Sequence, residues 1–65
     1  MRIVFRLPRA CVFYNFDYEE FVVKFWRDGV YLPDADYFTD DRSDAVGTAT
    51  RYDEEQRLAE MGEPA

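Results

Sequence analysis

Apolar and polar positions alternate along the first part of the chain. Within residues 2–7, Ile3 and Phe5 share one face, and residues 11–16 alternate again with apolar side chains on both faces. A period of two is typical of β-strands, and a strand with two apolar faces is typical of the middle of a sheet. Pro8 has no amide hydrogen to donate and is expected to end the first strand.

Residues 17–28 fit two interpretations. As a helix, the segment begins with Asp17 and Glu20 in a spacing that resembles a capping box, and its apolar residues follow at helical intervals. As a hairpin, its β-branched and aromatic residues form a strand, and Asp28-Gly29 is the favoured turn before a further apolar run. We favour the hairpin because the residue types are strand formers.

Residues 33–38 are interpreted as an acidic connection, and a helix is expected to follow it. Thr39, Asp40 or Asp41 can each serve as the N-cap, since short polar side chains accept hydrogen bonds from the first free amides of a helix. An apolar stripe that could pack on the sheet then follows helical spacing. Its members are Ala45, Val46, Ala49, Tyr52 and Ala59. Gly47 weakens this helix by about 1 kcal/mol relative to alanine.

These elements predict a single α+β domain over residues 1–65. Its architecture is a small antiparallel sheet of three to four strands with a C-terminal helix packed on one face. The other face of the sheet would carry partly exposed aromatic side chains, which suggests a binding surface or a dimer interface. Residues 62–65 are expected to form a frayed tail.

The composition supports a folded protein in a reducing compartment. The chain has 65 residues, among them six Phe, five Tyr and one Trp, and aromatic side chains bury large areas. Its one cysteine, Cys11, cannot form an internal disulfide, which favours the cytoplasm. The beginning of the chain does not read as a signal peptide, and no stretch approaches the roughly 18 apolar residues of a membrane span.

The charge is divided unevenly between the two halves of the chain. Residues 1–33 carry five basic and four acidic side chains, whereas residues 34–65 carry three basic and ten acidic ones, giving the net charge of −6. The electrostatic field of such an uneven charge distribution affects which partners bind and how fast they associate, rather than the fold. The largest class of positive protein surfaces is the one that binds nucleic acid, so a basic nucleic-acid-binding protein is the expected partner.

The residue types argue against catalysis. The sequence contains no histidine, and its three glycines form no phosphate-binding pattern, so we expect neither an enzyme nor a bound cofactor. Asp40 and Asp44 could hold a divalent cation if both lay on one helix. Helix capping together with a solvated acidic turn explains the same aspartates without a metal.

The acidic residues are instead candidates for a partner-binding surface. Helix neighbours three or four positions apart lie about 5–6 Å from each other, so Asp41 and Asp44 could imitate a short track of phosphates. Acidity that serves solubility alone is the alternative. The candidate partner-binding residues are Asp34, Asp36, Tyr37, Asp40, Asp41, Asp44, Asp53, Glu54 and Glu55.

One segment of the chain resembles part of certain short phage or prophage proteins. The residues that carry this resemblance are Ala35-Asp36-Tyr37-Phe38-Thr39-Asp40-Asp41, Asp44-Ala45 and Thr48-Ala49. With its size, acidity and lack of histidine, the chain is similar in kind to anti-CRISPR and other phage anti-defence proteins.

The resemblance implies a non-enzymatic inhibitor in the cytoplasm of the host cell. Its acidic face would mimic DNA and block the DNA-binding groove of a CRISPR effector complex, and the protein itself would bind neither nucleic acid nor membrane. We expect a monomer or a weak dimer. The alternative hypothesis is an interaction or assembly module, such as a homodimer or a virion accessory protein, that uses the aromatic face of the sheet.

Overall fold

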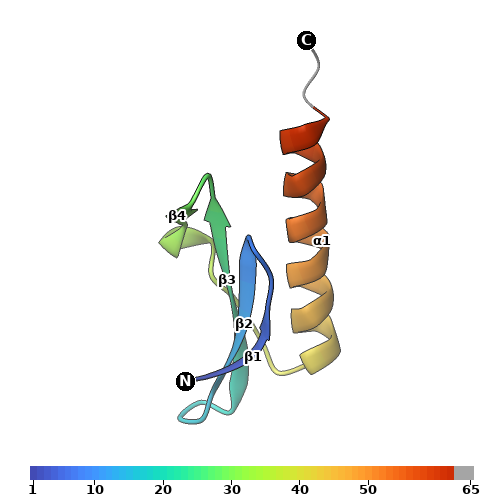
Figure 1. Ribbon diagram of the computed structural model, residues 1–65. Helices are drawn as coiled ribbons and strands as arrows, with labels where there is room; N and C mark the ends of the chain where they lie inside the picture. Colours follow the sequence, from blue (N-terminus) through green and yellow to red (C-terminus); the bar gives the residue numbers. More distant parts are fainter. Residues whose placement is uncertain (63–65) are drawn as a thin grey trace.

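The computed structural model describes residues 1–62 and contains an antiparallel sheet covered by a helix (Figure 1). The elements are β1 (Arg2–Arg6), β2 (Ala10–Asn15), β3 (Glu20–Arg27), β4 (Val30–Tyr31), the 3-10 turn η1 (Pro33–Ala35), β5 (Tyr37–Thr39) and α1 (Arg42–Met61). The predicted α+β fold is confirmed, with five strands instead of three or four. Of the tail predicted at 62–65, residues 63–65 lie outside the described residues.

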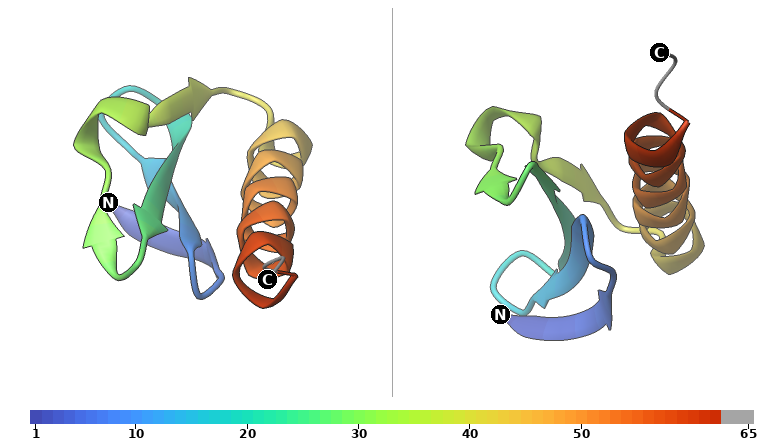
Figure 2. Two further views of the ribbon diagram at one scale, coloured as in Figure 1. Left: turned by 90° about the horizontal axis from the view of Figure 1, so that it is seen from above. Right: turned by 45° about the horizontal axis from the view of Figure 1, so that its top comes forward.

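Strand β3 is the longest strand and pairs along both of its edges. One edge pairs with β2, which in turn pairs with β1. The other edge is shared by two short strands, β5 opposite residues 21–23 and β4 opposite residues 26–27. In both views of Figure 2, β4 and η1 lie on the side of β3 away from α1. They therefore lie over the C-terminal half of β3, on the face that the helix does not cover.

Residues 20–31 form the hairpin that the strand-forming residue types favoured. Asp28 and Gly29 have φ angles of 53° and 79°, and positive φ at both positions is typical of a two-residue type I′ turn. The helical interpretation of residues 17–28 is wrong because the side chains alternate between the two faces of β3. Val23 and Phe25 are buried beneath α1, and Trp26 pairs with Tyr31 of β4.

The expectation that residues 33–38 form only a connection is wrong at its end. Residues 37–39 form β5, in which Phe38 lies opposite Val22 of β3. Tyr, Phe and Thr favour strands. A run of three residues flanked by aspartates is, however, shorter than the alternation that identifies a strand in a sequence.

Asp41 is the N-cap of α1, one of the three residues that the sequence offered. Its carboxylate accepts hydrogen bonds from the amides of Ser43 at 2.8 Å and Asp44 at 3.2 Å. At the other end, the amide of Gly62 donates to the carbonyl oxygen of Leu58 at 2.6 Å. Side-chain and backbone partners thus satisfy groups at both ends that would otherwise lack intrahelical bonds.

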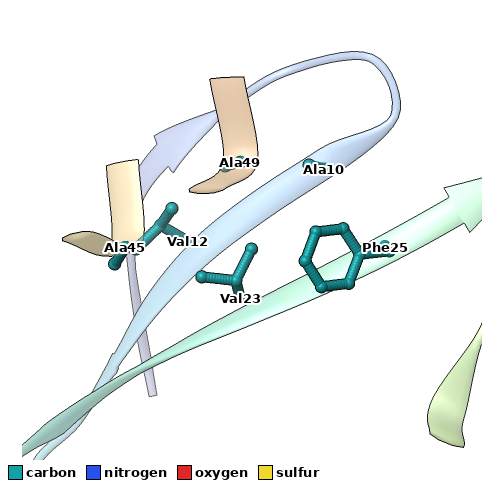
Figure 3. Packing of buried hydrophobic residues seen from close by; sticks show 6 residues of the cluster. All are labelled: Ala10, Val12, Val23, Phe25, Ala45 and Ala49. Atoms are coloured by element: carbon teal, nitrogen blue, oxygen red, sulfur yellow. The ribbon is translucent and has the colours of Figure 1, made fainter. Parts of the chain in front are cut away.

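Small side chains allow α1 to lie close to the sheet. The buried core consists of Ala10, Val12, Val23, Phe25, Ala45 and Ala49 (Figure 3). Tyr52 extends this core, because its ring contacts Phe25 at 4.7 Å between centroids and its hydroxyl donates to the carbonyl oxygen of Trp26 at 3.0 Å. Ala59, the last member of the predicted stripe, is exposed because the final turns of α1 extend past the sheet (Figure 1).

Enlarging Ala49 should separate the helix from the sheet. Ala49 is fully buried, so Ala49→Leu is expected to lower the free energy of unfolding by about 1–3 kcal/mol through overpacking. Thr50→Leu is the matched control, since Thr50 is the next residue of α1 and is exposed. Urea denaturation of both variants checks this, and equal midpoints would contradict the close contact.

Gly47 offers a stabilising substitution. It is exposed within α1, and a Cβ atom there would have no neighbour within 4 Å. Gly47→Ala should therefore raise the free energy of unfolding by about 0.5–1 kcal/mol, because alanine loses less backbone entropy in a helix. Gly29→Ala should act in the opposite direction, since Gly29 has a φ of +79°. Thermal unfolding followed by circular dichroism measures both, and a Gly47→Ala variant that melts below the parent would refute the expectation.

Candidate functional site

The nine candidate residues fall into two groups in the structure. Six of them lie in or next to η1, β5 and the first turn of α1, within residues 34–44. The other three occupy the middle of α1, at residues 53–55. At about 1.5 Å per residue, roughly 15 Å of helix separate the two groups. We call Asp34, Asp36, Asp40, Asp41 and Asp44 the acidic edge.

Asp36 is neutralised within the protein. Its carboxylate accepts hydrogen bonds from Lys24 Nζ at 2.9 Å and from the hydroxyl of Tyr31 at 2.7 Å, and Lys24 also donates to Tyr31 at 3.0 Å. The hydrogen bond to Tyr31, opposed by burial and reinforced by Asp36, raises the pKa of Lys24. A lysine held in its charged form is a poor nucleophile, so this cluster fixes the chain on either side of η1 to β3 rather than preparing a reactive amine.

Tyr37 and Asp44 join β5 to α1. The hydroxyl of Tyr37 donates to Asp44 Oδ2 at 2.6 Å, and this hydrogen bond is the main cause of the raised pKa of Tyr37. Arg51, on α1, lowers the same pKa through its charge. One basic side chain therefore acts on this part of the acidic edge, and the carboxylates do not form an uninterrupted negative track.

The remaining carboxylates of the acidic edge are exposed. Asp41 accepts only the backbone amides of its helix cap. Asp34 and Asp40 make no hydrogen bond or ion pair with another residue in the part of the chain that the structure describes. The structure thus leaves Asp34, Asp40, Asp41 and Asp44 with carboxylate oxygens that a partner could reach.

Asp53 has a different role from the one that the sequence predicted. It is half-buried, and it accepts hydrogen bonds from the amide of Arg9 at 2.9 Å and from the Arg9 guanidinium at 3.4 Å. The same guanidinium binds Glu60 through two bonds of 2.8 and 3.0 Å. Asp53 is therefore a structural residue that holds the β1–β2 loop against α1.

The two other helix candidates remain at the surface. Glu54 lies 4.0 Å from Arg57 in an exposed pair, which contributes little to stability. Glu55 is exposed. No local signal in the sequence separates these two residues from Asp53, because the partner of Asp53 lies 44 positions away in the chain.

The cation hypothesis for Asp40 and Asp44 loses its geometric basis. Helix α1 begins at Arg42, so Asp40 precedes the helix, and four-residue spacing does not place the two carboxylates on one helical face. Within residues 1–62, no three acidic, cysteine or histidine side chains are grouped so that they could hold a metal ion.

A second surface lies on the face of the sheet opposite α1, which we call the open face. Ile3, Phe13, Val22 and Phe38 lie side by side across β1, β2, β3 and β5, and we call them the apolar row. Ile3 and Phe38 are 44% and 55% exposed. The sequence predicted aromatic side chains on this face but not the row itself, because Phe38 was assigned to a connection.

A groove of 610 Å³ opens beside the apolar row, between the β1–β2 loop and the β3–β4 turn. Arg6, Phe13 and Trp26 contribute to its lining, together with Cys11, which is only 4% exposed. Burial keeps this thiol from solvent, and it packs as a small apolar strand residue.

Comparisons with protein-family models, with curated proteins and with solved structures gave no match to this chain. Within residues 1–62, no helix has both the length and the apolar character that a membrane span requires. The interpretation of the site therefore depends on its own geometry and charge.

The ion pair between Arg9 and Glu60 should make stability depend on acid pH. The hydrogen bond from Arg9 lowers the pKa of Glu60 below its ordinary value of 4.5. A carboxyl group with a lowered pKa in the folded state stabilises the protein above its unfolded pKa, and this contribution is lost as the pH falls through the folded pKa. When the pH is lowered from about 5 to about 3, the free energy of unfolding of Glu60→Gln should therefore fall less than that of the parent.

Glu55→Gln is the matched control for this prediction, since Glu55 is an exposed glutamate of the same helix with no such arginine. Melting temperatures measured by circular dichroism across this range compare the three proteins. Parallel curves for the parent and Glu60→Gln would show that the ion pair contributes nothing to the acid dependence.

Proposed function

We propose that this protein is a non-enzymatic inhibitor whose acidic edge occupies the DNA-binding groove of a basic, nucleic-acid-binding protein. The observation that carries the proposal is the set of exposed carboxylates at the junction of β5 and α1. Asp40, Asp41 and Asp44 are exposed there, and Asp40 has no partner among the described residues. Hydrogen bonds within the fold hold the carboxylates of Asp41 and Asp44, so these two side chains lose little entropy on binding.

The balance of charges in the fold supports this proposal. Arg9 and Lys24 are engaged with acidic side chains of the same chain. The acids that stay exposed therefore give the surface its negative field, in keeping with the net charge of −6. Complementary fields accelerate association and make binding sensitive to salt. Fast association and sensitivity to salt are both expected of a protein that competes with DNA for a basic groove.

The resemblance to anti-CRISPR and other phage anti-defence proteins favours a CRISPR effector complex as the partner, in the cytoplasm of a bacterial host. A non-enzymatic role agrees with the chemistry of the chain. The sequence has no histidine, and the polar cluster around Lys24 is committed to the fold. Inhibition by occupancy needs only a stable surface of the right charge.

Reversing two charges of the acidic edge should weaken binding to such a partner. The immobilised chain is exposed to a lysate of a bacterial host at low salt, the bound protein is identified by mass spectrometry, and its affinity is then measured with purified components. Asp40→Lys with Asp44→Lys should raise the dissociation constant at least about tenfold, because like charges then face each other. Duplex DNA should displace the chain from its partner.

Asp17→Lys with Glu19→Lys is the control, because it changes the net charge equally in the exposed β2–β3 loop, away from the acidic edge. Circular dichroism verifies that each variant is folded, which matters because Asp44 also accepts the hydroxyl of Tyr37. A partner that binds duplex DNA and this chain at the same time would refute the mimicry, as would equal losses in both double variants.

A further inference from the structure

The open face carries two parallel rows of side chains. The first is the apolar row. The second lies one step further along the strands: Arg6 is opposite Cys11, Cys11 is opposite Lys24, and Lys24 binds Asp36. Each row therefore crosses the whole sheet, from the edge formed by β1 to the edge formed by β5. The row is basic at its β1 end, whereas its other end holds the Lys24–Asp36 ion pair with the exposed Asp34 two residues before Asp36.

We propose that a second copy of this chain packs on the open face, in a dimer whose two-fold axis runs parallel to the strands. This inference goes beyond the proposed function and does not rest on it. The hydrophobic core of the isolated domain is small, because its largest fully buried side chains are only Val12 and Val23. Small domains with a small core often gain stability from association.

The order of side chains in each row selects this axis. A two-fold axis parallel to the strands leaves each row at the same position along the strands. It reverses the order of the side chains across the sheet, so β1 of one copy lies over β5 of the other. Ile3 then meets Phe38 of the second copy, and Phe13 lies over Val22, which is already only 2% exposed within one copy. Exposed apolar side chains at both ends of the row are covered together, and apolar contact is what distinguishes the core of homodimer interfaces.

The charges agree with the same axis. Arg6 is exposed and makes no ion pair with another residue of the described range 1–62. In this arrangement it faces the segment of the second copy that carries Asp34, which is exposed and has no ion pair in the described residues. A two-fold axis perpendicular to the strands would place β1 over β1 and reverse positions along the strands, so that Arg6 would lie away from the segment that carries Asp34. The parallel axis alone brings these opposite charges together, and complementary charges favour it.

The shape of the open face is also self-complementary. The segment of β4 and η1, residues 30–35, projects on the side of β3 away from the helix (Figure 2). The groove lined by Arg6, Phe13 and Trp26 lies toward β1. It is level with β4 along the strands, because Trp26 lines the groove and also pairs with Tyr31 of β4. The axis brings the projecting segment of each copy over the groove of the other. Val30, which is 63% exposed in that segment, is an apolar side chain for this groove.

Sedimentation equilibrium of the purified full chain, over a range of concentrations, tests the dimer. We expect a concentration-dependent dimer that Phe38→Ser weakens at least about tenfold, because the change removes apolar contact from both symmetric copies. Leu58→Ser is the control: Leu58 is 51% exposed, close to the 55% of Phe38, but lies on α1. A chain that stays monomeric at every concentration, or a dimer weakened equally by both variants, would overturn the proposal.

The sign of one charge reversal tests the axis. Arg6→Glu should weaken the dimer, and adding Asp34→Arg should restore it, because the pair is then re-formed with its signs exchanged. Arg27→Glu is the control, since Arg27 is an exposed arginine of β3 with no ion pair in the described residues. A dimer that Arg6→Glu tightens would show that Arg6 does not face an acidic side chain of the second copy, and would overturn the arrangement. Circular dichroism confirms that the variants are folded.

Discussion

The pairing of β3 with three other strands is the constraint on which the rest of the structure depends. Because β3 is bordered by β2 on one side and by β4 and β5 on the other, it fixes the register of the whole sheet. Its alternation places Val23 and Phe25 beneath α1 and Val22 and Lys24 on the open face. Both candidate surfaces follow from it: the acidic edge lies on either side of β5, which pairs with β3, and the apolar row crosses β3 at Val22. A change of register by one residue would exchange the two faces.

The sequence predicted those features that local chemistry determines. The turn at Asp28-Gly29 and the cap of α1 each depend on a few neighbouring residues; the favoured hairpin contains this turn, and Asp41 is one of three N-cap residues that the sequence offers. Strand β5 was missed because its three residues acquire their structure from β3 rather than from their own pattern. The role of Asp53 was missed for a related reason, since Arg9 is distant in the sequence. Contacts between remote segments leave no periodic signal in a single chain.

The acidic residues divide into two kinds. Asp36, Asp53 and Glu60 each meet a basic side chain and hold segments of the fold together. Asp34, Asp40 and Asp41 remain at the surface without a basic partner among the described residues. The asymmetry of charge along the sequence therefore overstates the free negative surface, because three of the acids in the second half share two basic side chains of the first half. What remains is concentrated near the start of α1, which gives the proposed interface a definite position.

The order of the elements has a consequence for the synthesis of this chain. Every strand precedes α1, and Ala45 and Ala49 supply the cover for Val12 and Val23. While the ribosome is still extending the chain, the sheet can pair its strands but has no helix to shield this face. Arg9 likewise has neither of its acidic partners until Asp53 and Glu60 have been synthesised, 44 and 51 residues later. A newly made sheet thus has apolar side chains uncovered on both faces until α1 has folded onto it.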